Sequence, residues 1–214
     1  MLKSIRKTLC VAGLVVLSAA MLSAQGKPKV AHNNNGKSHG SVVLYTNFVG
    51  AYPFWDTTSG YFVDGANFFN QVIAQGFRVS NTGPFADTAL ALGIYKTGGS
   101  ASYVRVKTYL MSDAGGVPGS ILDGPLTQQY RVQPFENGRG GGIVQFNCVT
   151  CPTLNGGSSY WIAALQDQAR VEDTWDFSFS DFSSPFAFNQ TGTLTGWYAV
   201  PSGYIRSAYQ ADGN

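Results

Sequence analysis

The sequence predicts an all-β protein, an antiparallel β-sandwich or jelly-roll-like fold built as a single domain. Hydrophobic residues recur with a period of two in several short segments, which is the pattern of a strand with one buried face. Turns rich in Gly, Asn and Pro separate these segments, and no long segment has the 3.6-residue period of a helix. Short strands between such turns are typical of sandwiches.

The first 24 residues have the three parts of a secretory signal peptide. They begin with a basic region (KSIRK), continue with an apolar region (CVAGLVVL), and end at Ala24, a small residue suited to cleavage. An apolar run of roughly 15 residues is too short for a membrane span, which needs about 20. We therefore expect a secreted, extracellular or cell-surface protein with no stable membrane span after processing.

Residues 25–40 (QGKPKVAHNNNGKSHG) predict a flexible tail, because they have no apolar periodicity and cannot bury enough surface to fold. Both histidines of the chain, His32 and His39, lie in this tail, where a pair seven residues apart is a weak signal for a metal site. The folded domain is expected over residues 41–214, which is one domain's worth of chain.

The charge of the expected domain differs from that of the whole chain. The chain has 14 basic and 12 acidic residues, but the leader and the tail each hold three of the basic ones and none of the acidic ones. The remaining 8 basic residues stand against 12 acidic ones. This balance gives no basic footprint for nucleic acid, so we expect no nucleic-acid partner.

The clearest strand is expected over residues 102–111 (SYVRVKTYLM). Its alternate residues share one face, namely Val104, Val106, Thr108 and Leu110, and the other face carries Tyr103, Arg105, Lys107 and Tyr109. A second alternation, TWDFSFSDF, sets bulky Trp and Phe residues against Asp and Ser residues. Further strands are expected in VVLYTNF, VIAQGFRVS, ALALGIYKT, LTQQYRVQ, GIVQFN, SYWIAAL, GWYAV and GYIRSAY.

The segment SDAGGVPGS, residues 112–120, predicts a hairpin turn. Asp113 is expected to cap the turn, and Gly119 is expected to take the left-handed conformation. A calcium loop needs several acidic ligands at alternating positions, and a single aspartate among glycines does not supply them.

Cys148 and Cys151 form a C-x-x-C pair (NCVTCPTL) that admits three interpretations. A redox centre of the thioredoxin kind needs a following helix, and PTLNGGSS does not predict one. A structural zinc site needs four ligands, but the domain has no histidine and no second C-x-x-C. We favour a structural disulfide in a tight loop, which export would allow to oxidise. We expect no metal and no cofactor.

No catalytic residues are expected. A Ser-His-Asp triad needs a histidine, and the domain has none. Glu172, Asp173, Asp176 and Asp181 gather around Trp175 and resemble the paired acids of a sugar hydrolase. We favour the simpler interpretation, a polar loop that enters a strand with outward-facing acids.

The aromatic residues leave two interpretations open. Trp55, Trp175 and Trp197, with Asp176 beside them, are candidate glycan contacts, because flat rings can stack on the apolar faces of sugars. In an all-β domain with few long aliphatic residues, the same tryptophans are more often the core. The triplet Asn189-Gln190-Thr191 is also a formal N-glycosylation sequon.

Several ordered motifs resemble one family, the choice-of-anchor R type of exported bacterial domain, which accompanies PEP-CTERM sorting tails. The matching segments are NQVIAQGFRV, ALALGIYKTGGSASYVRVKTYLMSDAGGVPGSILD, FNCVTCPTL and GSSYWIAAL. The resemblance implies a β-sandwich displayed outside the cell and brings no catalytic residues with it. This sequence ends in YIRSAYQADGN, without the family's C-terminal anchor, so release or non-covalent retention is expected.

Together these observations predict an exported, non-catalytic β-sandwich of the cell surface or extracellular matrix. Its expected partners are extracellular polysaccharides or surface proteins. The alternative is a carbohydrate-binding module that uses exposed Trp or Tyr residues.

Overall fold

The computed structural model describes residues 42–48, 55–64, 70–80, 82–98, 103–131, 140–166, 168, 172–178 and 181–214. The expected signal peptide and flexible tail lie outside these residues. In the part of the chain that is described, no helix is long and apolar enough to cross a membrane.

The described chain is built of β-strands joined by turns and loops. The strands are β1 (Val42–Thr46), β2 (Trp55–Asp64), β3 (Val72–Arg78), β4 (Phe85–Gly98), β5 (Tyr103–Asp113), β6 (Pro118–Arg131), β7 (Gly140–Asn147), β8 (Thr153–Leu154), β9 (Ser159–Gln166), β10 (Glu172–Ser178), β11 (Phe186–Asn189), β12 (Tyr198–Val200) and β13 (Tyr209–Gly213).

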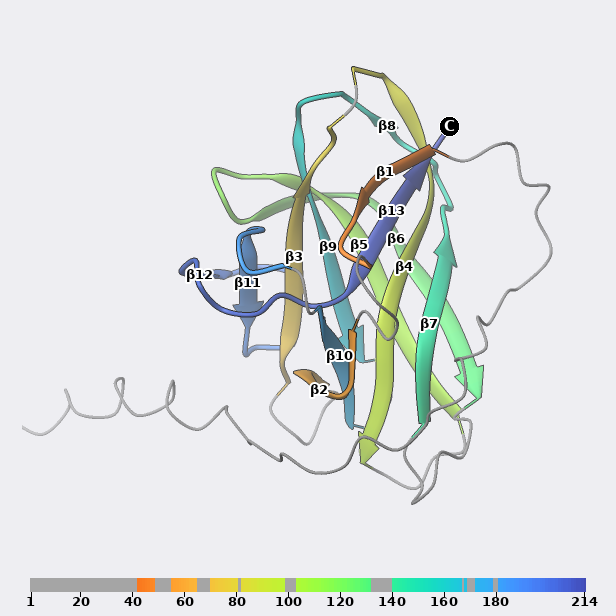
Figure 1. Cartoon of the computed structure of the whole chain (residues 1–214), viewed down its shortest axis with the longest axis vertical. Helices are drawn as coiled ribbons and strands as arrows, with labels where there is room; N and C mark the ends of the chain where they lie inside the picture. Colours follow the sequence, from red (N-terminus) through yellow and green to blue (C-terminus); the bar gives the residue numbers. More distant parts are fainter. Residues whose placement is uncertain are drawn as a thin grey trace, which may run out of the picture.

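These strands form two antiparallel sheets that pack against each other, so the predicted all-β sandwich is confirmed (Figure 1). The first sheet has the order β1-β13-β4-β10-β2, and both β7 and β8 pair with the long central strand β4. The second sheet has the order β12-β11-β3-β9-β5-β6. Strands distant in sequence lie side by side in both sheets, as where β1 pairs with β13.

The main core lies between the sheets. Strand β5 illustrates how the sequence builds it, because Val106, Thr108 and Leu110 are all fully buried on its inner face, as the alternation predicted. Trp175 of β10 lies in the same core and donates a hydrogen bond from Nε1 to the Ala208 carbonyl oxygen at 2.9 Å. Its ring meets the Tyr209 ring edge-on, with the centroids 6.1 Å apart.

A second, smaller cluster lies on the other side of the second sheet. Its buried members are Ala74, Tyr109, Met111, Trp161, Ala163 and Ala187. Leu194 and Trp197, from the loop between β11 and β12, pack against this cluster. That loop therefore shields an apolar sheet face that a simple two-layer sandwich would leave in water.

The β5–β6 hairpin matches its prediction in one respect and corrects it in another. The Asp113 carboxylate accepts the backbone N–H groups of Gly115 at 3.1 Å and Gly116 at 3.2 Å, so Asp113 caps the turn as expected. The positive φ angles fall at Gly115 (77°) and Gly116 (93°) rather than at Gly119. Gly119 already belongs to β6, where its backbone is extended.

The C-terminal strand is shifted from its expected place. The segment GYIRSAY, residues 203–209, was predicted as a strand, whereas β13 begins only at Tyr209. The reason is Arg206, whose side chain turns inward and donates hydrogen bonds to the carbonyl oxygens of Ser184, Tyr204 and Pro201. The preceding residues wrap around this guanidinium instead of continuing the strand.

Candidate functional site: an aromatic edge at β12

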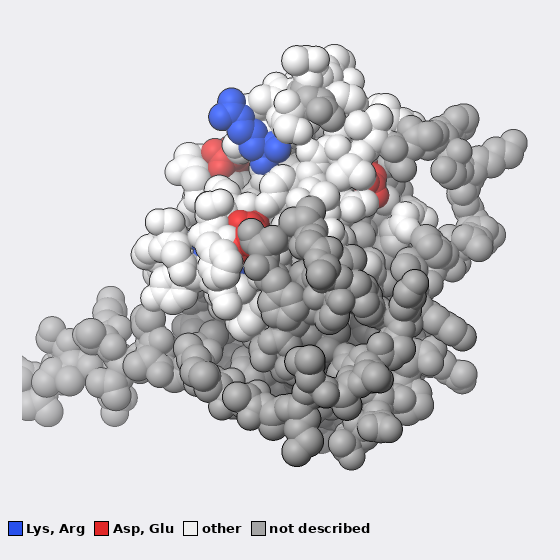
Figure 2. Space-filling model, in the orientation of Figure 1, with Lys and Arg blue, Asp and Glu red and all other residues white. Residues whose placement is uncertain are grey.

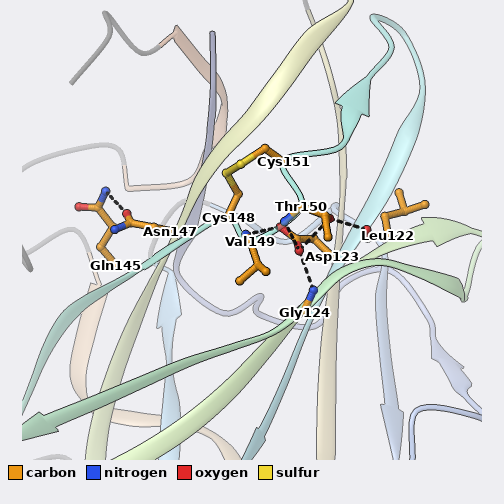
Figure 3. Close-up of a disulfide and its surroundings, with 9 residues drawn as sticks. All are labelled: Leu122, Asp123, Gly124, Gln145, Asn147, Cys148, Val149, Thr150 and Cys151. Carbon is orange, nitrogen blue, oxygen red and sulfur yellow. Dashed lines mark hydrogen bonds between the residues drawn. A yellow bond between two sulfur atoms is a disulfide. The ribbon is translucent and has the colours of Figure 1, made fainter. Parts of the chain in front are cut away.

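The disulfide loop was the first candidate site suggested by the sequence. A disulfide joins Cys148 and Cys151, whose Cα atoms are 5.0 Å apart, in agreement with the expected pairing (Figure 3). The loop connects β7 to β8, and both strands pair with β4. The disulfide thus closes the turn between two strands that pair with the same neighbour, β4.

Asp123 of β6 holds this loop from below (Figure 3). Its carboxylate accepts the backbone N–H groups of Val149 at 2.9 Å and Thr150 at 3.0 Å, the Thr150 hydroxyl at 2.9 Å and the Gly124 N–H at 2.9 Å. Burial alone would raise the pKa of Asp123, but these hydrogen bonds outweigh it and hold the pKa below its usual value. Asp123 is therefore an ionised structural group at neutral pH.

The same geometry argues against a redox function for the cysteine pair. In redox-active C-x-x-C sites, backbone N–H groups at a helix start stabilise the thiolate. Here no helix follows, since β8 begins at Thr153, and the Asp123 carboxylate occupies the N–H groups of Val149 and Thr150. A nearby negative charge also disfavours a thiolate. The arrangement is that of a structural staple.

Replacing Asp123 by alanine is expected to lower the free energy of unfolding by about 2–3 kcal/mol, because the N–H groups of Val149, Thr150 and Gly124 lose their charged acceptor. Denaturant unfolding followed by circular dichroism measures the change. The double variant Cys148→Ser/Cys151→Ser is the matched control, with an expected loss of about 2 kcal/mol from the freed loop. An Asp123→Ala variant as stable as the wild type would show that the carboxylate does not hold the loop.

The acidic cluster that resembled a hydrolase site is folded into the protein. Asp173 and Asp176 are both fully buried, and Asp181 is 6% exposed. Asp173 accepts a hydrogen bond from Gln166 Nε2 across the two sheets. The expectation that these acids face outward is therefore wrong for Asp173, Asp176 and Asp181. The Glu172 side chain lies outside the described residues.

Asp181 anchors a chain of hydroxyl groups that includes a serine. Tyr45 donates to Asp181 Oδ2 at 2.8 Å, and the Tyr45 and Ser184 hydroxyl oxygens are 2.6 Å apart. Burial raises the pKa of Tyr45 to about 12. Burial works against ionisation of Asp181 too, but the hydrogen bonds from Ser184, Ser183 and Tyr45 hold its pKa below the usual value.

This hydroxyl chain is unsuited to nucleophilic catalysis. A general base works best with a pKa near the operating pH. Asp181 is too weak a base to remove a hydroxyl proton, and a tyrosine with a pKa of about 12 stays protonated at neutral pH. The groups instead tie β1 to the loop before β11, together with Asn47, which donates to Asp181 Oδ2 at 3.2 Å.

Stability is expected to fall as pH rises from about 10 to 12. Burial raises the pKa values of Tyr45 and Tyr61 to about 12, while the unfolded chain ionises near pH 10. The unfolded state then binds fewer protons, so the free energy of unfolding decreases through this interval. Urea unfolding at stepped pH tests this, with Tyr61→Phe giving a shallower decline. Ionisation of all tyrosines near pH 10 in a still-folded protein would contradict it.

The candidate glycan contacts fare differently in the structure. Trp175 is 0% exposed, and so is Asp176, so neither can touch a ligand at the surface and both expectations are corrected. Trp197 is half-buried, donates from Nε1 to the Leu194 carbonyl oxygen at 3.0 Å, and packs on the second cluster. The Trp55 side chain lies outside the described residues.

Among the described residues, four exposed apolar side chains lie on β12 and on the loops that flank the β11–β12 ribbon, and we call this surface the aromatic edge. Its members are Phe182, Tyr198, Tyr204 and Ile205. Tyr198 is 63% exposed on β12, the edge strand of its sheet. Figure 1 shows β11 and β12 at one flank of the molecule. Tyr198 lies in the predicted strand GWYAV, where no sequence pattern sets it apart from the tryptophans.

Pairing within the β11–β12 ribbon fixes the direction of Tyr198. Phe188 pairs with Tyr198 and Phe186 pairs with Val200, so these four side chains share one face. The Phe188 and Tyr198 rings stack, with centroids 5.6 Å apart and planes at 28°. Phe186 is buried in the main core, so this face continues the core out to the sheet edge, where Tyr198 meets water.

The asparagine of the glycosylation sequon is buried by the fold. Asn189 is fully buried, and its Nδ2 group donates to the carbonyl oxygens of Thr195 and Gly196. Its Oδ1 accepts both the N–H and the hydroxyl of Thr191, each at 2.6 Å. Asn189 therefore shapes the β11–β12 loop, and a glycan on this amide is incompatible with the folded state.

The architecture and these sites define the chain as an antiparallel two-sheet β-sandwich with a disulfide staple and an exposed aromatic edge. No protein-family model matches the chain. No curated protein matches it either.

Proposed function

We propose that this chain is an exported, non-catalytic β-sandwich that acts at the cell surface or in the extracellular matrix through surface contact. The observation that carries the proposal is the placement of the acids. The carboxylates of Asp123 and Asp181 accept hydrogen bonds from within the protein. Asp173 and Asp176 are fully buried. The resemblance to choice-of-anchor R domains and the basic-apolar leader support export. A disulfide is compatible with an oxidising compartment.

Expression of the full chain in a bacterium with two membranes tests export. The expected product begins at Gln25, lies outside the inner membrane, and carries no alkylatable thiol until it is reduced. A product that stays in the cytoplasm with its leader intact and two free thiols would contradict the proposal.

A carbohydrate-binding function is the second candidate, and Tyr198 favours it. Its exposed ring is held by the stack on Phe188, so little side-chain freedom is lost when a ligand covers it. Tyrosines of this kind combine a large apolar face with a polar hydroxyl, which suits contact with sugars.

A further inference from the structure

The stretch that contains the aromatic edge is uncharged over its whole length. Residues 182–205 include no Asp, Glu, Lys or Arg. Their polar groups are hydroxyls and amides, supplied by Ser, Thr, Asn and Gln. Charge is sparse throughout this chain, in which 12% of residues are charged against about a quarter in a typical domain, and residues 182–205 form one of its long uncharged runs.

The charged residues at both ends of this stretch point into the protein. Asp181 precedes it and is held by Tyr45 at 2.8 Å and Asn47 at 3.2 Å. Arg206 follows it, is 1% exposed, and lies over the Phe186 ring with its guanidinium carbon 5.6 Å from the centroid. Neither charge is presented to a ligand. Figure 2 shows few charged groups among the described residues of the visible face.

Arg206 also contacts both the loop after β12 and strand β11, which border the aromatic edge. It donates to the Tyr204 carbonyl at 3.0 Å while lying over Phe186, so the loop that follows β12 folds back onto the face that carries Tyr198. The Gly203 N–H donates to the Phe182 carbonyl at 3.2 Å, which joins the loop before β11 to the same place. Tyr61 donates to the Ile205 carbonyl at 2.8 Å and fixes the loop from the first sheet.

We propose that the aromatic edge binds an uncharged polysaccharide, with Tyr198 as the stacking residue. This inference rests on the contact function proposed above and names the ligand class for it. Aromatic rings offer flat apolar area to the C–H faces of neutral sugars, and the surrounding hydroxyls and amides match sugar hydroxyls.

The chemistry of the edge selects this ligand class. An acidic polymer would need Lys or Arg contacts and would show salt-dependent binding, yet residues 182–205 supply no such group. A protein partner of standard size buries about 800 Å² per side, with hot spots rich in Trp, Tyr and Arg set in close-packed pockets. The exposed apolar groups here are three aromatic rings and Ile205 at an open edge.

The test is a pull-down of the exported full chain on insoluble polysaccharides of both kinds, neutral (cellulose, β-1,3-glucan, starch) and acidic (calcium alginate, pectate). The expected result is saturable binding to at least one neutral polymer, with the affinity changing less than about twofold when the salt is raised tenfold. Tyr198→Ala is expected to weaken binding at least about tenfold, and Tyr198→Phe to retain most of it.

Val149→Ala is the matched control, because Val149 is 71% exposed at the disulfide loop and is not part of the edge. It is expected to bind like the wild type. Circular dichroism and the thermal midpoint report whether each variant folds. Should Tyr198→Ala fail to fold, Tyr204→Ala serves as the second variant, because Tyr204 lies in a loop and is exposed.

Several results would overturn the inference: no binding to any neutral polymer, binding that salt abolishes, or binding that both edge variants leave intact. Retention of a protein partner at the edge in place of a polysaccharide would also overturn it. None of these results affects the contact function itself, which fails instead if the chain stays in the cytoplasm or catalyses turnover.

Discussion

Replacing Trp175 by alanine is expected to lower the free energy of unfolding by about 3–5 kcal/mol. The indole is fully buried between the sheets, so its removal costs apolar transfer energy and leaves a cavity in the core beside β10. The Ala208 carbonyl oxygen also loses its hydrogen bond from Nε1, originally at 2.9 Å. A loss of this size is a large part of the stability of a typical domain.

Denaturant unfolding measured by circular dichroism tests this expectation, since the signal does not depend on the removed tryptophan. Trp197→Ala is the matched control, because Trp197 is half-buried on the outer cluster and is expected to lose less. Equal losses in the two variants would contradict the placement of Trp175 in the main core.

Replacing Asp181 by alanine is expected to cost about 2–4 kcal/mol, because neutral donors that bond its carboxylate are left without an acceptor. Four donors lose their acceptor: Tyr45 Oη, Asn47 Nδ2 and the backbone N–H groups of Ser183 and Ser184. Asp181→Asn is expected to lose less, because an amide keeps one acceptor oxygen.

The effect of Asp181 on stability depends on pH in a defined direction. Its pKa is lowered in the folded state, so its contribution is present above the unfolded pKa of about 3.9 and is lost as pH falls through the folded value. The difference between wild type and Asp181→Asn should therefore shrink below about pH 4. A difference that stays constant down to pH 2 would show that the charge of Asp181 is not the stabilising feature.

The fold could be predicted where the information is local. The alternation of Val106, Thr108 and Leu110 identifies a strand and its buried face, because a period of two needs no knowledge of distant segments. The turn capped by Asp113 is local as well, since the carboxylate bonds N–H groups two and three residues ahead.

The outward direction predicted for Asp176 failed because its burial depends on distant segments. Because Trp175 faces the core, alternation places the Asp176 side chain on the opposite face of the sheet. That face is exposed to solvent only if no other segment covers it. In the structure, distant segments flank Asp176 within the sheet: its carbonyl oxygen accepts the Ala208 N–H at 2.7 Å on one edge of β10, and Gly60 of β2 pairs with it on the other, so β10 is an interior strand. Neither neighbour is visible in the local pattern.

Tyr198 was missed as a site residue for a related reason. The tryptophans are the candidates suggested by the sequence, because their flat rings can stack on sugars, and exposure in three dimensions favours Tyr198 instead. Trp175 is central in the first sheet and buried, whereas Tyr198 lies on the edge strand of the second sheet. Which strand is an edge follows from pairing between β11 and β3, residues more than 100 positions apart.

One incubation tests the central claim that this sandwich acts by contact and not by catalysis. The mature protein is mixed with each polysaccharide, and two quantities are measured together: the protein retained by the polymer and the reducing sugar ends released from it. We expect saturable retention on a neutral polymer with no new reducing ends. Release of reducing ends that scales with protein and is lost on unfolding would contradict it.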